Sequence, residues 1–210
     1  MTRYLSPNNN PADLINLPEP RYESSCPVES AIRSRRSVRD YSGKPLTLGE
    51  VSQLLWAAQG ITSPQGERAA PSAGALYPLE LYVAVGDVEN LPQGIYKYHP
   101  RRHSLIRIDD ADVRAKLSTA ALAQSCVRDG AVTILIASVH RRITGTYGRR
   151  GIQYIYMEAG HVSQNIHLQA EALNLGTVAV GAFDDRSVKI VMKLAEDEEP
   201  LYIMPVGRKR

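Results

Sequence analysis

The chain has 210 residues, 43% of them apolar, so a single domain with a sizeable core is the first expectation. The formal net charge is +3, and the basic residues gather at 33–39, 101–107, 141–150 and 208–210. This pattern favours local anion sites over a nucleic-acid partner, with a basic groove carrying stacking tyrosines as the weaker alternative. No apolar run reaches the roughly 20 residues that span a bilayer, and no signal peptide is evident, so we expect a cytoplasmic protein without a membrane partner.

The cysteines and histidines do not indicate a metal site. Cys26 and Cys126 lack the spacing of metal ligands, and without a secretion signal they are expected to be reduced thiols. The histidines are too dispersed along the chain to form a recognisable cluster. We therefore expect no metal.

The first segment, residues 1–26, is rich in proline and asparagine and is expected to be an irregular arm. The folded domain is expected to cover residues 27–210. It begins with Pro27, which suits the first turn of a helix, and apolar residues give the stretch 28–33 one buried side.

A basic segment follows this helix. Arg35, Arg36, Ser37 and Arg39 place three guanidinium groups and a hydroxyl within five residues. Arginine remains charged and offers a planar fork of donors that can hold a phosphate through two hydrogen bonds. The segment is thus a candidate anion site, and a solvated basic turn is the alternative.

The next elements are a helix and a loop of small residues. Thr47 with Glu50 predicts a capping box, and apolar residues at helical spacing predict a helix that ends at Gly60. The loop 70–78 then contains Pro71, Ser72, Ala73 and Gly74, whose small side chains would let a flat ligand lie against the backbone. The alternative is an ordinary loop that enters a strand.

The remaining chain alternates between strand and helix patterns. The stretch 79–85 alternates as a strand, and 95–98 with 105–108 predicts a hairpin. A helix is expected over 111–123 and a central strand over 131–139. The longest periodic element is expected over 151–174, as a helix buried either in the monomer or at the centre of a dimer.

Several of these segments, taken together and in order, resemble the nitroreductase superfamily of FMN enzymes. They are the basic entry at 35–39, the Pro-Ser-small-small loop at 71–74, the Gly-Ala-Phe-Asp turn at 181–184 and the Pro-Val-Gly end with basic residues at 205–210. The resemblance implies an α+β fold with a central, mainly antiparallel sheet flanked by helices. It also implies an intertwined homodimer with FMN at the subunit interface.

The resemblance also implies roles for individual residues at the phosphate end of FMN. Arg35, Arg36 and Ser37 would hold the phosphate and ribityl oxygens, and Arg208 and Arg210 would complete the clamp. This chain ends sooner after Pro-Val-Gly than many relatives do, so the terminal pair is the less certain part of the match.

Other residues would surround the flavin ring. Arg39 would face its N1 and O2 edge, and Gln124 would contact the pyrimidine side, unless it is only a surface amide at a helix end. Val180, Gly181 and Ala182 would pass near N5 and O4, and residues 71–74 would reach the partner's flavin.

Further motifs resemble the SagB-type branch, whose members include azoline dehydrogenases. They are 94–100, Gln124, and 147–151 before 158–161. In that branch a lysine and a tyrosine assist proton removal, but here Thr146 stands at the lysine position beside Tyr147. Threonine cannot act as a general base near neutral pH. Tyr147 remains a catalytic candidate, and a tyrosine that only packs in a loop is its alternative.

The expected function is therefore an FMN-dependent oxidoreductase with ping-pong hydride transfer through flavin N5. NADH or NADPH would be the donor, and an electron-poor small molecule would be the acceptor. The alternatives are an azoline dehydrogenase acting on a modified peptide and a flavin-binding protein without turnover.

Overall fold

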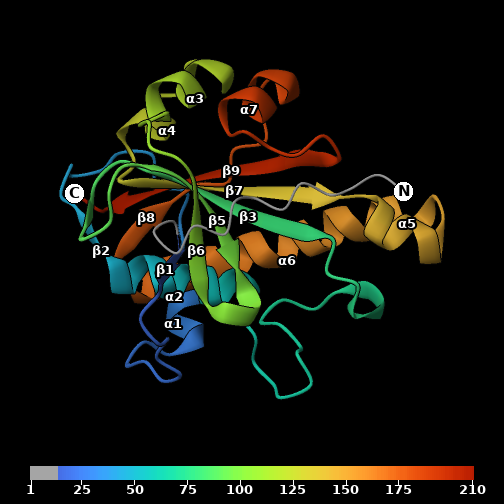
Figure 1. The fold of residues 1–210 in the computed structure, drawn as a ribbon. Coiled ribbons are helices and arrows are strands. Elements are labelled where there is room, and N and C mark those ends of the chain that lie inside the picture. The colour runs from blue at the N-terminus through green and yellow to red at the C-terminus, as the bar shows by residue number, and fades with distance from the viewer. Residues whose placement is uncertain (1–13) are drawn as a thin grey trace.

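The structure is a computed structural model, and it describes residues 14–210 (Figure 1). Seven strands form one sheet in the order β1-β6-β5-β3-β7-β9-β8, and each neighbouring pair is antiparallel. The strands are β1 (Leu14–Asn16), β3 (Leu79–Val85), β5 (Gly94–His99), β6 (Ser104–Asp109), β7 (Val132–Val139), β8 (Leu175–Thr177) and β9 (Glu198–Arg208). Two short strands, β2 (Leu46–Thr47) and β4 (Val88–Glu89), pair in parallel apart from this sheet.

Helices cover both faces of the sheet. They are α1 (Val28–Ser34), α2 (Leu48–Gln59), α3 (Arg114–Ala120), α4 (Ser125–Asp129), α5 (Arg141–Tyr147), α6 (Arg150–Ala172) and α7 (Asp185–Val191). Figure 1 shows α1, α2 and α6 on one face, α3, α4 and α7 on the other, and α5 at one end. The α+β architecture with a mainly antiparallel central sheet is thereby confirmed.

The sheet separates two apolar clusters. One joins the strands to α2 and α6 through residues such as Leu54, Leu55 and Val162. The other joins them to α3, α4 and α7 through residues such as Leu117 and Val188. Strand β7 lies between β3 and β9, and every residue in it is buried. Its near-continuous apolar sequence is what a strand covered on both faces requires.

Several local predictions are confirmed. The Thr47 hydroxyl accepts from the Glu50 amide at 3.2 Å, and the Glu50 carboxylate accepts from the Thr47 amide at 2.7 Å, which completes the capping box. Helix α2 ends at Gln59, before Gly60. The hairpin is formed by β5 and β6, joined through the short 3₁₀ turn Pro100–Arg102.

Two predictions differ from the structure. The helix expected over 111–123 is shorter than predicted: α3 ends at Ala120, and Leu122 and Ala123 adopt left-handed backbone angles before the separate helix α4 begins. The arm expected to be irregular contains β1, which pairs with β6 at the edge of the sheet. Residues 1–13 of that arm lie outside the described part of the chain.

Helix α6 runs along the sheet with one buried side. Ile155, Ala159 and Ile166 are among its buried residues, as the helical spacing predicts. Tyr156, although apolar in character and next to Ile155, is 56% exposed, because it is rotated by about 100° from Ile155 around the helix. Within residues 14–210, no helix is both long and apolar enough to cross a bilayer.

Candidate functional site

The basic segment that follows α1 runs beside the sheet edge at β8. Ser37 forms a parallel bridge with Thr177, and the Val38 amide donates to the Thr177 carbonyl at 2.9 Å. Helix α1 ends at Ser34, so the arginines emerge where the chain turns to follow the strand. We call residues 35–39 the arginine rim.

Two arginines of the rim have no carboxylate partner. Arg35 is half-buried and Arg39 is exposed, and within residues 14–210 neither makes an ion pair or a side-chain hydrogen bond. Among the described residues, Arg36 donates only to the backbone carbonyls of Arg33 and Arg35, at 3.1 and 2.7 Å. Ser37 is exposed. The rim therefore presents free guanidinium donors, as an anion site requires.

Gln124 and the segment 180–182 meet on the side of the sheet covered by α4. Val180 exchanges both backbone hydrogen bonds with Ile203 at 2.9 Å, while Gly181 and Ala182 are exposed. The Gln124 side-chain amide donates to the Ala182 carbonyl at 3.1 Å. The structure thus joins two predicted site residues that are 58 positions apart in the sequence.

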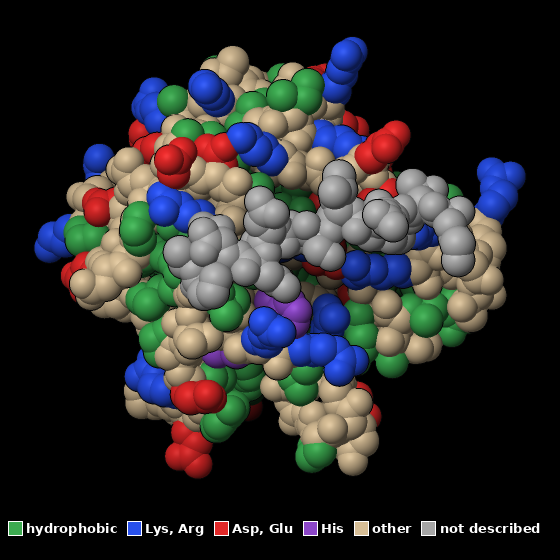
Figure 2. All heavy atoms as spheres, viewed as in Figure 1, with side chains coloured by type: hydrophobic (Ala, Val, Ile, Leu, Met, Phe, Trp, Pro, Cys, Tyr) green, Lys and Arg blue, Asp and Glu red, His purple; other side chains and the backbone are tan. Residues whose placement is uncertain are grey.

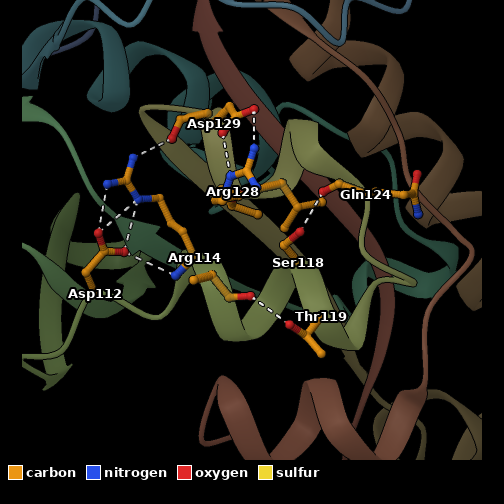
Figure 3. A network of polar contacts seen from close by, with 11 residues as sticks. Asp112, Arg114, Ser118, Thr119, Gln124, Arg128 and Asp129 are labelled. Atoms are coloured by element: carbon orange, nitrogen blue, oxygen red, sulfur yellow. Dashed lines mark hydrogen bonds and ion pairs between the residues drawn. The ribbon is translucent and has the colours of Figure 1, made fainter.

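Figure 3 shows how Gln124 is held between α3 and α4. The Ser118 hydroxyl donates to the backbone carbonyl of Gln124 at 2.8 Å. The Gln124 side chain also donates to the Ala121 carbonyl at 3.0 Å. Its amide nitrogen therefore holds the backbone, and the oxygen is the group left to face a ligand.

The terminal arginines differ from those of the rim. Arg208 donates to both carboxylate oxygens of Glu50 at 3.0 Å and to the Pro45 carbonyl at 2.9 Å. Arg210 pairs with Asp40 at 3.0 Å and donates to the Tyr41 carbonyl at 3.1 Å. A phosphate role for Arg208 would require its bidentate ion pair to break. Arg210 is exposed, so its ion pair is the easier one to exchange.

The loop 71–74 lies against Tyr147. Gly74 has a φ of 62°, and a Cβ placed on it would lie 2.8 Å from the Tyr147 hydroxyl oxygen. Only glycine fits there without a shift of the tyrosine. Tyr147 is 36% exposed and packs edge-on against Tyr154 with ring centroids 5.2 Å apart. Pro71 is exposed, and Ser72 and Ala73 are half-buried.

Glu158 of α6 contacts this loop through Ser72, and from the sequence we named it only within the motif 158–161, without a role of its own. It is 2% exposed, and its Oε1 accepts from the Gln59 side-chain amide at 3.5 Å. Burial raises the pKa of Glu158, and hydrogen bonds with Ser72 and Gln59 oppose that rise. A charged residue on the buried side of a periodic helix was the available signal.

The candidate residues therefore form two groups at opposite ends of the molecule. Figure 1 shows β8 and the C-terminus at one end, and α5 with the chain that enters β3 at the other. The arginine rim, residues 180–182 and Gln124 belong to the first end, and residues 71–74 and Tyr147 belong to the second. One copy of the chain does not bring the two groups around one ligand.

Comparison with known proteins gives consistent results. The sequence matches the Nitroreductase family model over residues 32–208. A candidate nitroreductase of Methanocaldococcus jannaschii is 48% identical over 182 residues, which are 87% of this chain and 91% of that protein. A crystal structure of a candidate nitroreductase from Anabaena variabilis matches with a TM-score of 0.83 and 33% identity, over 94% of this chain and 42% of that one. The E. coli microcin synthetase McbBCD complex with truncated pro-MccB17 bound shares the fold, with a TM-score of 0.72 and 22% identity, over 86% of this chain and 73% of that one.

Proposed function

Because this chain belongs to the nitroreductase family, whose model spans residues 32–208, we propose that it is an FMN-dependent oxidoreductase. In this proposal NADH or NADPH is the hydride donor, and an electron-poor organic molecule is the acceptor. Donor and acceptor would use one site in turn, so the kinetics would be ping-pong. The observation that carries the proposal is the arginine rim, where Arg35 and Arg39 lack any ion-pair partner within residues 14–210.

The residues present fit the phosphate end of FMN. Phosphate carries negative charge and acceptor oxygens, and Arg35, Arg36 and Ser37 present donors to solvent at one edge of the sheet. Arg210 would join them by exchanging Asp40 for the phosphate. Arg208 would have to leave Glu50 to take part, which makes it the weakest member of the predicted clamp.

The ring would be held by backbone and side-chain groups of the same end. FMN, when bound, supplies hydride transfer at N5. Arg39 would hold a positive charge against the N1 and O2 edge, which favours negative charge there. The Gln124 side-chain oxygen would accept from the pyrimidine side. Val180, Gly181 and Ala182 would line the N5 and O4 region with exposed backbone at 181 and 182.

We further propose that a second copy of the chain completes the site. Pro71, Ser72, Ala73 and Gly74 lie at the opposite end of the same chain, so a partner's loop must supply them. Tyr147 would come with that loop, because its hydroxyl lies against Gly74. It would place a phenolic proton beside the substrate, with general acid as its role.

One alternative has specific support. The McbBCD complex shares the fold and holds a peptide precursor, which suggests an azoline dehydrogenase acting on a modified peptide for this chain too. Thr146 argues against it, because that position lacks the lysine that the branch uses as a base. Azole formation is expected to be slow or absent, and efficient formation would favour the alternative.

An absorption spectrum before and after anaerobic NADH or NADPH tests the proposal. The purified protein should show flavin bands that bleach with nicotinamide and return when a quinone or nitroaromatic acceptor is added. Flavin that binds but never bleaches would indicate a binding protein or another donor. A colourless protein that takes up no added FMN would contradict the proposal.

A further inference from the structure

A cleft near the β5–β6 turn is separate from the arginine rim. Its volume is about 440 Å³, within the range of small-molecule pockets. It lies beside the chain that enters β3, and Figure 2 shows basic side chains and a histidine gathered around the β5–β6 turn. The residues that line it and matter for its chemistry are Arg68, Lys97, His99, Arg101 and Arg142.

Arg68 is the unusual member of this cleft. It is half-buried, and its guanidinium carbon lies 4.4 Å from the centroid of the Tyr77 ring. Its Nη1 donates to the Gln59 side-chain oxygen at 2.8 Å, and this is its only side-chain hydrogen bond within residues 14–210. No carboxylate of that part of the chain forms an ion pair with it. Glu80 and Glu158 act on Arg68 electrostatically without contacting it, so within residues 14–210 its guanidinium has no carboxylate at ion-pair distance.

Two other cations of the cleft are paired with carboxylates, and a third has no ion pair among the described residues. Lys97 pairs with Glu198 at 2.6 Å and with Glu80 at 3.3 Å. Arg142 also pairs with Glu80. Arg101 is exposed and makes no ion pair among the described residues. The cleft therefore carries more positive charge than its single lining carboxylate, Glu80, offsets.

His99 adds an unsatisfied polar atom. Its Nδ1 is buried and has no hydrogen-bond partner among residues 14–210. Buried polar atoms are nearly always paired, and an exception in a cleft indicates a missing partner. Because this nitrogen is enclosed, it marks an incompletely satisfied wall of the cleft, and the anionic group of a ligand is assigned to Arg68.

We propose that this cleft binds a small organic carboxylate, held by the Arg68 guanidinium. Stacking on Tyr77 leaves the edge of the guanidinium, with Nε and Nη2, for a planar two-oxygen acceptor. A carboxylate offers that geometry and a single charge. Leu76, Tyr98 and Ile106 line the same cleft and would contact an apolar body on the ligand. This site does not depend on the proposed flavin chemistry.

Fluorine NMR of 4-fluorobenzoate with the purified protein tests this site. The probe should broaden and shift in a saturable way, and neutral 4-fluorobenzamide should bind at least about tenfold more weakly. Equal binding of the two probes, or no saturable binding, would overturn the proposal. Displacement by inorganic phosphate at lower concentration than by unlabelled benzoate would overturn the choice of a carboxylate.

Variants locate the binding. Arg68→Met keeps the length of the side chain and should weaken 4-fluorobenzoate binding about tenfold or more. The matched control is Arg128→Met, because Arg128 is an exposed arginine on α4 that pairs with Asp129; it should leave binding unchanged. Arg39→Ala, at the arginine rim, should also leave it unchanged. Unaltered binding in Arg68→Met would overturn the proposal, and if that variant does not fold, Arg101→Met must weaken binding for the proposal to stand.

Discussion

The arginine rim and the ion pairs at the two ends of β9 use basic side chains in opposite ways. At the ends of β9, Arg208 is bound to both oxygens of Glu50, and Lys97 is bound to Glu198. At the rim, Arg35 and Arg39 have no carboxylate within residues 14–210. An arginine's place in a sequence motif therefore does not decide its use. What decides it is whether the fold has already supplied an anion.

The ion pair of Lys97 with Glu198 is supported by further hydrogen bonds to the Glu198 carboxylate. Glu198 is 2% exposed and accepts from Lys97 and Tyr82, each at 2.6 Å, and from the Ala195 amide at 2.9 Å. Burial raises the pKa of Glu198, but the bonds from Lys97 and Tyr82 outweigh burial and the net shift is downward. A buried carboxylate with this many donors is expected to be charged and structural.

The largest expected effect comes from removing that carboxylate. Glu198→Ala should lower the free energy of unfolding by about 2 kcal/mol or more, because the buried Tyr82 hydroxyl and the Ala195 amide lose their acceptor and Lys97 keeps only Glu80. Urea unfolding measures it. Glu199→Ala is the control, since Glu199 is exposed and, within residues 14–210, pairs only with Lys189; it should cost about 0.5 kcal/mol or less. A loss below about 1 kcal/mol in Glu198→Ala would contradict the structural role.

The next largest effects are opposite changes in FMN affinity and stability at Arg39 of the rim and at Arg208 of β9. Arg39→Met should lower FMN affinity about tenfold or more and leave stability within about 0.5 kcal/mol. Arg208→Met should do the opposite, because it strips Glu50 of its bidentate partner. Flavin fluorescence titration and urea unfolding on both variants provide the four values. If Arg208→Met also loses FMN while retaining full stability, Arg208 belongs to the phosphate clamp after all.

The contribution of Glu198 to stability is expected to depend on pH. The folded pKa of Glu198 is depressed, so its stabilising contribution is present above the unfolded pKa of about 4.3 and is lost as pH falls through the lower folded pKa. Wild-type protein should therefore lose more stability on acidification below that pH than Glu198→Gln does. Parallel curves of stability against pH for the two proteins would show that the folded pKa of Glu198 is not depressed.

A smaller effect of opposite sign is expected at Glu158. Its folded pKa is raised, so its stabilising contribution is present below the unfolded pKa and is lost as pH rises through the folded pKa. Glu158→Gln removes this titration and should gain stability relative to wild type as the pH is raised. Thermal unfolding of both proteins, followed from the unfolded pKa of about 4.3 upward, measures the difference. A constant offset between the two curves would exclude the raised pKa.

Local sequence patterns predicted most elements but not their long-range partners. The capping box at Thr47 and Glu50 is readable because both bonds lie within one helical turn. The second use of Glu50, as the partner of Arg208, depends on how β9 packs beside α2 and leaves no local signature. The break between α3 and α4 also escaped prediction, because alanine-rich sequence favours a helix and tertiary contacts override it.

The candidate site shows the same division. The composition of residues 35–39 predicts an anion site, and that of residues 71–74 predicts a loop open to a flat ligand. The structure places the first beside β8 and the second against Tyr147. The bond between Gln124 and Ala182, the burial of Glu158 beneath Ser72 and the unpaired Arg68 arise only from tertiary packing. Neither periodicity nor charge patterning reports such contacts.

If two copies of the chain build each flavin site from opposite ends, variants with defects at different ends should complement each other. Arg39→Ala and Gly74→Val are each expected to lose FMN, because each removes one end of the site. Co-expressed with separable tags, the two variants should form mixed dimers in which one of the two sites is intact, so about one site in four regains FMN under random pairing. Recovery at that level, confined to the mixed dimer, is the predicted result. Mixed dimers without any FMN would contradict the account, since they would show that one chain supplies both ends.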